Sequence, residues 1–267
     1  MTQTNTTAAD DALVLREDRD GIAYLTLNRP NQFNALSEEL LDALQANLDA
    51  IAEDKSVRVV VLAGNGRAFC AGHDLKQMRT QNERAYFQQL FTRCGQGMTR
   101  ISSLPQPVIA RVHGIATAAG CQLVASCDLA IAEEGSRFAV SGINVGLFCG
   151  TPSVPLSRNV GRKQAMEMLL TGGFIPAQQA AAEGLINRAV PLEQLDDEVL
   201  KLARTICDKS SASVALGKAM YYKQLEMGVE QAYQFASEAM ADNMMFEDVG
   251  ERIDAFTEKR PPNWRDR

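Results

Sequence analysis

The stretch from His113 to Asp128 constrains the fold of this 267-residue chain more than any other. The apolar run Pro107 to Val112, just before it, is typical of a buried strand. Small residues follow, and from near Ala119 the apolar residues take a helical spacing. We therefore expect a strand, a tight turn and a buried helix. The N–H groups that start this helix could hold an anion or a developing oxyanion, although the turn could equally serve only to pack the helix on a sheet.

Composition and charge exclude several functional classes. The formal net charge of -6 and the pI of about 5.1 argue against a general nucleic-acid binder, which is usually basic. No apolar run approaches the roughly 18 residues of a membrane span, so we expect no contact with a membrane. Residues 1–11 carry neither a basic nor an apolar signal region. We therefore expect a disordered tip at 1–11 and a cytoplasmic protein.

Cysteine and histidine usage argues against a metal site. The chain has 6 cysteines and 2 histidines. None of the cysteines form a CxxC pair, and neither histidine lies at ligand spacing from a cysteine. We expect reduced cysteines that are mostly buried, and no bound metal.

The remaining pattern predicts strands that alternate with helices, as in a layered α/β fold. Leu13 to Arg16 and Gly21 to Leu27 predict a hairpin, and the apolar run Val57 to Ala63 predicts a strand buried on both faces. Ser37 is a good N-cap for a helix that ends near Glu53.

The last part of the chain is expected to be almost entirely helical. The predicted helices cover 192–207, 212–226, 229–245 and 248–259. We therefore divide the chain into the tip at 1–11, an α/β core at 12–191 and a helical region at 192–267.

Two segments together go beyond a generic α/β pattern. One is the run 67–76, RAFCAGHDLK, and the other is the stretch described first. With Leu27-Asn28-Arg29-Pro30 and Asn34-Ala35-Leu36 upstream, they resemble the crotonase superfamily, which contains the enoyl-CoA hydratases and isomerases. The likeness runs from about residue 13 to 264, through later segments such as 144–146, 166–172, 180–186 and 255–260.

This resemblance implies a crotonase-like spiral of ββα turns. C-terminal helices would cover the pocket and build a homotrimer, or a hexamer formed as a dimer of trimers. Members bind acyl-CoA thioesters, and no separate cofactor is implied because coenzyme A is part of the substrate. Two backbone N–H groups form an oxyanion hole in the family, and the matching positions here are His73 and Ala119.

The resemblance also implies a CoA site. The phosphates and adenine would contact Arg29, Lys76 and the backbone from Ala71 through Gly72 to Leu75, with Ala35 in the same binding region. Phe256 and Lys259 would close over the adenine, from a neighbouring subunit. Alternatively, these two residues form only a solvated helix end.

The sequence departs from the family where hydratases carry two glutamates, because Gln122 and Gly142 stand there. Neither can act as a general acid or base, and such groups each contribute roughly 10²–10⁴-fold. Asp74 and Ser141 are substitute candidates, although Asp74 could be only a helix N-cap and Ser141 only a loop hydrogen-bond donor. We therefore expect inefficient hydration of 2-enoyl-CoA.

This pattern resembles a divergent branch of the superfamily, the enoyl-CoA hydratase domain-containing proteins. Three functions remain open. The first is an acyl-CoA enzyme with altered chemistry, such as a decarboxylase, thioesterase or isomerase. The second is a non-catalytic acyl-CoA sensor or scaffold. The third is a hydratase that uses substitute acid and base groups.

Overall fold

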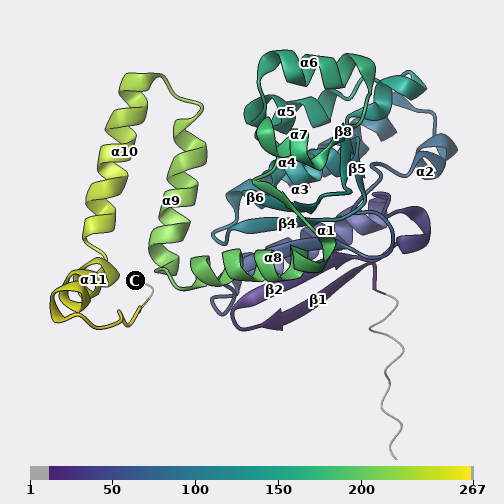
Figure 1. The fold of residues 1–267 in the computed structure, drawn as a ribbon. Coiled ribbons are helices and arrows are strands. Elements are labelled where there is room, and N and C mark those ends of the chain that lie inside the picture. Colours follow the sequence, from purple (N-terminus) through teal and green to yellow (C-terminus); the bar gives the residue numbers. More distant parts are fainter. Residues whose placement is uncertain (1–11, 266–267) are drawn as a thin grey trace, which may run out of the picture.

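A six-stranded sheet runs through the computed structural model, which describes residues 12–265 (Figure 1). The strand order is β1-β2-β3-β4-β6-β9. The first two strands, β1 (Val14–Arg19) and β2 (Ile22–Leu27), form the antiparallel hairpin predicted from the sequence. All later neighbours are parallel, namely β3 (Val59–Gly64), β4 (Val108–Val112), β6 (Leu129–Glu133) and β9 (Arg188–Val190). Helical crossovers between the parallel strands confirm the α/β class.

Strand β3 is buried on both faces, as its apolar run predicts. Val60 and Leu62 face the main core, whereas Val59 and Val61 face a smaller cluster on the other side. Helices α1 (Glu38–Glu53), α3 (Arg84–Ser103) and α4 (Ala119–Ser126) contribute to the main core. The hydroxyl oxygen of Ser37 accepts a hydrogen bond from the Leu40 N–H, so the predicted N-cap of α1 is confirmed.

A second, shorter layer lies beside the main sheet and builds the turns of the spiral. It contains β5 (Ile115–Thr117), β7 (Arg137–Ala139) and β8 (Ile175–Pro176). Isolated bridges between Leu36 and His73 and between Cys70 and Ala116 extend it. The sequence analysis expected only a turn where β5 lies. That expectation was wrong because β5 pairs with β7, a partner that local sequence does not reveal.

Four short helices, α2 (Leu75–Thr80), α5 (Gly150–Asn159), α6 (Arg162–Thr171) and α7 (Ala177–Ala182), complete the core. Helix α8 (Leu192–Cys207) packs on the far face of the sheet through Leu195, Val199 and Ala203. The part of the chain that stands away from the sheet therefore begins after α8, not at residue 192. The tip proposed at 1–11 lies outside the described residues.

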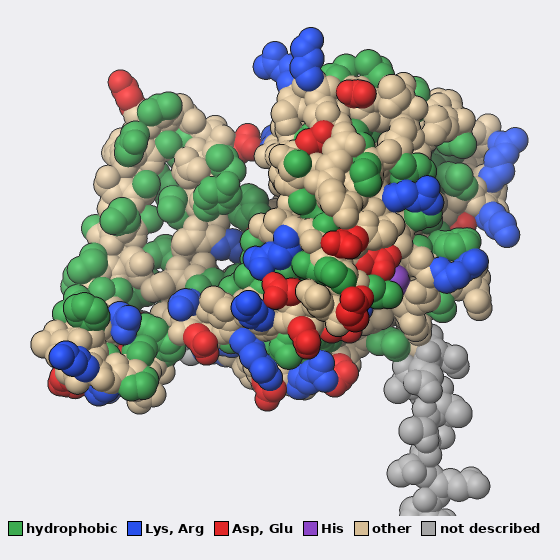
Figure 2. All heavy atoms as spheres, in the orientation of Figure 1, with side chains coloured by type: hydrophobic (Ala, Val, Ile, Leu, Met, Phe, Trp, Pro, Cys, Tyr) green, Lys and Arg blue, Asp and Glu red, His purple; other side chains and the backbone are tan. Residues whose placement is uncertain are grey.

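Helices α9 (Ser211–Gln224), α10 (Val229–Met244) and α11 (Glu247–Glu258) form an arm beside the core (Figure 1). Hydrophobic side chains cover much of the arm surface (Figure 2). The exposed ones include Tyr221, Leu225, Val229, Tyr233, Met240 and Met244. Among the described residues, no helix has the length and apolar character needed to span a membrane.

Candidate active site

A cavity of about 510 Å³ opens beside the start of α4. Its wall is formed by α2, α3, the first residues of α4 and the segment 141–152. Six of the sequence-predicted site residues line it: Ala71, His73, Leu75, Ala119, Ser141 and Gly142. The tertiary structure therefore brings together residues that are up to 71 positions apart, from 71 to 142.

The two proposed oxyanion-hole positions lie next to each other. A Cβ placed on Gly72 would lie 3.2 Å from the Ala119 nitrogen, and Gly72 has a φ of +93°. A side chain at position 72 would therefore crowd the Ala119 backbone, and the positive φ also favours glycine there. Among the described residues, neither the His73 N–H nor the Ala119 N–H has a hydrogen-bond acceptor. Ala119 begins α4, so its N–H points out of the helix start, where the dipole favours negative charge.

Ala118, just before this helix, has an unusual backbone conformation. Its φ is 51° and its ψ is −121°, a region that L-residues rarely adopt. Its N–H donates to the Ala139 carbonyl oxygen at 2.9 Å, which ties the strained residue to β7. Strain of this kind costs about 1–3 kcal/mol and persists where surrounding structure fixes it. Here it turns the chain so that the Ala119 N–H meets the cavity wall.

The imidazole of His73 is neutral at physiological pH. Burial lowers its pKa to about 4, and the nearby Leu36 carbonyl offsets this only in part. Neither ring nitrogen has a hydrogen-bond partner among the described residues, and both are shielded from solvent. The ring packs edge-on against Phe91, with centroids 5.5 Å apart. His73 is therefore a poor general base near pH 7.

The two positions that hold glutamates in hydratases carry no acid or base. Gln122 is 3% exposed, and its Oε1 has no hydrogen-bond donor among the described residues. At Gly142 the space for a side chain is already filled. An added Cβ would lie 2.5 Å from the Leu147 carbonyl oxygen and 2.8 Å from the Cys149 Sγ. Leu147 and Cys149 therefore occupy the space that a side chain at position 142 would need.

Asp74 has the N-cap role that the sequence analysis weighed against catalysis. Its Oδ1 accepts from the N–H groups of Lys76 and Gln77, and its Oδ2 lies 2.9 Å from an Arg29 nitrogen. Burial raises the pKa of the carboxyl, but these hydrogen bonds outweigh burial and hold the pKa below its ordinary value. Both oxygens of Asp74 are thus engaged in structure.

Ser141 and Cys149 are two further polar side chains in the cavity wall, which also contains Thr151. The Ser141 Oγ lies 2.7 Å from the Thr117 Oγ1, a partner on β5 that the sequence analysis did not single out. The Cys149 Sγ accepts a hydrogen bond from the Gly142 N–H at 3.2 Å. Burial raises the pKa of the Cys149 thiol, so it is a weak nucleophile near pH 7.

The proposed CoA residues fall into two groups. Arg29, Ala35 and Lys76 do not line the cavity, although Lys76 follows the lining residue Leu75. An Arg29 nitrogen donates to the Ala35 carbonyl oxygen at 2.5 Å. Phe256 and Lys259 lie on or just after α11, at the far end of the arm (Figure 1). Phe256 is 74% exposed. A single chain therefore does not bring these two residues to the cavity.

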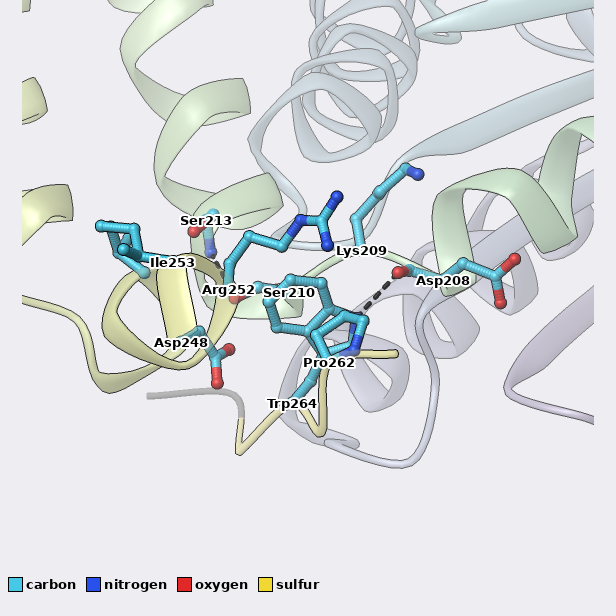
Figure 3. A pocket seen from close by; sticks show the side chains of 10 residues that line it. Asp208, Lys209, Ser210, Ser213, Asp248, Arg252, Ile253, Pro262 and Trp264 are labelled. Atoms are coloured by element: carbon cyan, nitrogen blue, oxygen red, sulfur yellow. Dashed lines mark hydrogen bonds between the residues drawn. The ribbon is translucent and has the colours of Figure 1, made fainter. Parts of the chain in front are cut away.

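A second cavity, of about 450 Å³, lies between the start of α9, α11 and the C-terminal segment (Figure 3). The indole N–H of Trp264 donates to the Asp208 carbonyl oxygen at 2.8 Å along its edge. This cavity shares no residue with the first one and contains none of the sequence-predicted site residues.

Comparison with known proteins agrees with this geometry. The family model for enoyl-CoA hydratase/isomerase matches residues 17–267. The chain belongs to this family. It is 45% identical to enoyl-CoA hydratase domain-containing protein 3, mitochondrial, of Rattus norvegicus, over 96% of this chain and 85% of that protein.

Solved structures in the family confirm the fold. An enoyl-CoA hydratase from Mycobacterium smegmatis superposes with a TM-score of 0.94 at 56% identity and covers 95% of this chain and 99% of its own. Human enoyl-CoA hydratase domain-containing protein 3 gives a TM-score of 0.92 at 44% identity, covering 95% and 100%. The crotonase-like fold and the likeness to the domain-containing branch are thus confirmed.

The cytoplasmic expectation was wrong. The relatives from rat, mouse, frog and human are named as mitochondrial proteins, which points to mitochondria. The expectation rested on the lack of a secretory signal and of a membrane span, and neither feature distinguishes cytoplasm from mitochondria. Mitochondrial targeting segments are amphipathic and Arg-rich, a different pattern from the one sought.

Proposed function

We propose that this enoyl-CoA hydratase/isomerase family member binds an acyl-CoA thioester and polarises its carbonyl through the His73 and Ala119 N–H groups. The observation that carries this proposal is the pair of adjacent N–H groups without acceptors at the wall of a cavity. Such preorganised donors stabilise charge that develops on the thioester oxygen. The helix start at Ala119 adds to this stabilisation.

Efficient hydration of 2-enoyl-CoA is not the reaction that we propose. Hydration needs a group that activates water and a group that delivers a proton. The cavity offers a neutral His73, a Cys149 thiol with a raised pKa and the Ser141 hydroxyl. None of these groups titrates near pH 7, and the glutamate positions are Gln122 and Gly142.

The reactions that fit best need only oxyanion stabilisation by the protein. Decarboxylation of an acyl thioester forms an enolate, and its proton can come from water. Thioester hydrolysis or a slow isomerisation can also proceed with water as the proton carrier. We keep these as the catalytic possibilities, with no bound cofactor or metal proposed.

A non-catalytic acyl-CoA sensor or scaffold is the second candidate. The observation that favours it is the lack of a titratable group poised near pH 7 among the described residues that line the cavity. A hydratase with substitute groups is less well supported, because Asp74 is held by Arg29 and by the start of α2.

We also propose a homotrimer, or a dimer of trimers, in which the arm of one subunit reaches the next. The exposed apolar side chains of α9 and α10 need a covering surface. In such an assembly Phe256 and Lys259 of a neighbouring subunit could meet the CoA adenine near Arg29 and Lys76. The acidic protein is not proposed to bind nucleic acid or a membrane.

The decisive experiment incubates the protein at stoichiometric concentration with saturated, 2-enoyl, 3-enoyl, 3-hydroxy and malonyl thioesters of CoA. Mass spectrometry then reports both the retained ligand and any product. We expect binding of acyl-CoA, with slow or no water addition to 2-enoyl-CoA. Rapid hydration would contradict the argument from Gln122 and Gly142. Tight binding without any product would favour the sensor.

A further inference from the structure

The last described residues, 260–265, turn back along helix α11 and are called the C-terminal strap below. Lys259 ends the helix with a φ of 55°, and the Arg260 N–H donates to the Ala255 carbonyl oxygen at 3.0 Å. A left-handed residue at this position reverses the direction of the chain. The strap therefore begins next to Lys259, one of the two residues proposed for the CoA adenine.

Two carboxylates of α11 hold the strap against the helix. Glu251 accepts hydrogen bonds from two side-chain nitrogens of Arg260, at 2.6 and 3.1 Å, and from the Asn263 N–H at 2.7 Å. Nearer the start of the helix, Asp248 accepts from the Arg265 N–H at 2.6 Å. Positions 248 and 251 are three residues apart and share one side of the helix. The strap therefore runs along that side toward the start of α11.

Trp264 joins the strap to the rest of the chain. Its indole N–H donates to the Asp208 carbonyl oxygen at 2.8 Å, and Asp208 lies in the connection between α8 and α9 (Figure 3). This hydrogen bond spans 56 positions in the sequence. The strap is therefore bonded at one side to α11 and at the other to the α8–α9 connection.

Helix α11 has little apolar packing of its own. Among its 12 residues only Asp248 and Ala255 are buried. The cavity of about 450 Å³ separates the helix from the start of α9, with Val249 and Ile253 in its wall (Figure 3). Gaps of this size are few in a close-packed protein interior. Side-chain packing therefore does little to fix α11 against α9, and the strap supplies hydrogen bonds that do.

We infer that the C-terminal strap positions Phe256 and Lys259 for the CoA adenine by fixing α11 to the α8–α9 connection. Trp264 and Glu251 are then positioning residues, since neither is among the residues proposed to contact CoA. The inference rests on the proposed binding of acyl-CoA and on the proposed assembly in which α11 reaches a neighbouring subunit.

The test compares two thioesters that differ in the adenine nucleotide. Titration calorimetry with the full-length protein measures the affinity for butyryl-CoA and for S-butyryl-pantetheine, which keeps the thioester and lacks the nucleotide. We expect Trp264→Ala and Glu251→Ala each to weaken butyryl-CoA binding by about fivefold, the effect of one lost hydrogen bond. Binding of S-butyryl-pantetheine should not change.

Asp254→Ala is the matched control for the loss of a carboxylate on α11. Asp254 is exposed and makes no hydrogen bond or ion pair with the strap among the described residues, so both affinities should stay at the wild-type value. Equal weakening of both ligands in the strap variants, or no weakening of either, would overturn the inference. If wild-type protein binds neither ligand, the proposed function itself is overturned.

A double variant shows whether the strap acts through the end of α11. Lys259→Ala should weaken butyryl-CoA binding, and adding Trp264→Ala to it should weaken binding little further, because both changes remove the same contact. Fully additive losses would mean that Trp264 affects CoA binding by another route and would overturn the inference.

Fluorescence provides a readout in the wild-type protein. Trp264 is the only tryptophan of the chain, so the emission reports on the strap. If the strap strengthens CoA binding, CoA binding must strengthen the attachment of the strap by the same factor. We expect butyryl-CoA, but not S-butyryl-pantetheine, to reduce the quenching of this emission by acrylamide. Equal quenching with the two bound ligands would overturn the inference, even where a variant fails to fold or assemble.

Discussion

The ammonium group of Lys218 on α9 lies 2.6 Å from the Asp128 Oδ2, just after helix α4. The side chains are only 7% and 13% exposed. Lys218 also donates to the carbonyl oxygens of Ile101 and Gln106, and the hydroxyl of Tyr222 donates to the Asp128 Oδ1 at 2.8 Å. This buried ion pair therefore links the arm to α4, the helix that begins at Ala119.

Replacing Lys218 should destabilise the protein strongly. Lys218→Met leaves the Asp128 carboxylate buried without its counter-ion, which typically costs about 3–5 kcal/mol. Urea denaturation followed by circular dichroism measures the change. The control is Lys201→Met on α8, where the side chain is 74% exposed and a change within about 0.5 kcal/mol is expected. Similar losses in both variants would show that the ion pair adds nothing.

Stability should depend on pH through His73. Because burial lowers its pKa to about 4 from 6.5, the unfolded chain binds a proton between these values while the folded protein does not. Above pH 6.5 this difference in proton binding does not affect the free energy of unfolding. As pH falls toward 4, protonation of the unfolded chain lowers the free energy of unfolding by about 3 kcal/mol at most. The free energy of unfolding of wild-type protein should fall more than that of His73→Phe between pH 7 and pH 4.5. Parallel losses would show that His73 titrates normally.

Ala118→Gly should stabilise the fold. Glycine adopts a φ of 51° without the strain that alanine carries there, and the net gain expected is about 1 kcal/mol. Thermal and urea denaturation both measure it. The same change at Ala125, inside α4, should destabilise by about 1 kcal/mol because a helical residue gains nothing from glycine. A loss at both positions would mean that Ala118 is not strained.

Gly142 should resist substitution. A Cβ there meets a backbone oxygen and a buried sulfur, so Gly142→Ala is expected to destabilise by about 1–3 kcal/mol. Gly150→Ala, in the same cavity wall with no atom within 4 Å of its added Cβ, is the control and should be nearly neutral.

The close contacts around Gly142 also affect any attempt to introduce hydratase activity by adding the two glutamates. We expect Gln122→Glu with Gly142→Glu to remain inactive in hydration of crotonyl-CoA, measured by loss of enoyl absorbance, because the loop has no room for the second side chain. Substantial hydration by this variant would show that only the two carboxylates are missing.

The proposed oxyanion hole can be tested by removing one backbone N–H. Ala119 is the first residue of α4, where proline breaks no hydrogen bond inside the helix, although the conformation of Ala118 before it does not suit a proline ring. Ala119→Pro removes the N–H, and losing one such donor raises the barrier by about 2.7–4 kcal/mol, or roughly 10²–10³-fold in rate. Turnover of whichever thioester proves active measures it. Arg162→Pro at the start of α6 tests the effect of proline alone and should keep full activity.

Most of the fold could be predicted from the sequence because its signals are local. The apolar run at β3, the N-cap at Ser37 and the helical spacing from Ala119 each depend on near neighbours, and the structure confirms all three. Strand β5 was missed because its three residues are strand-like only through pairing with β7.

The candidate site could be predicted in part. The motif around His73 and the helix start at Ala119 are visible in the sequence, and the structure places them at one cavity. The Thr117 partner of Ser141 was missed, because a hydroxyl pair 24 positions apart leaves no trace in spacing. The partners of Asp128 were missed as well, because Lys218 and Tyr222 lie about 90 residues away and carry no signal of their own.

The sequence by itself determined the family, the order of helices and strands, and the absence of glutamates at positions 122 and 142, since these depend on residue identity and local spacing. Only the tertiary structure decided that the loop after Gly142 fills the space of a side chain and that Lys218 neutralises Asp128. It also decided that the ring nitrogens of His73 have no hydrogen-bond partner within residues 12–265. These features depend on distances between segments far apart in the chain. Packing density and burial set those distances, and no local pattern of residues encodes them.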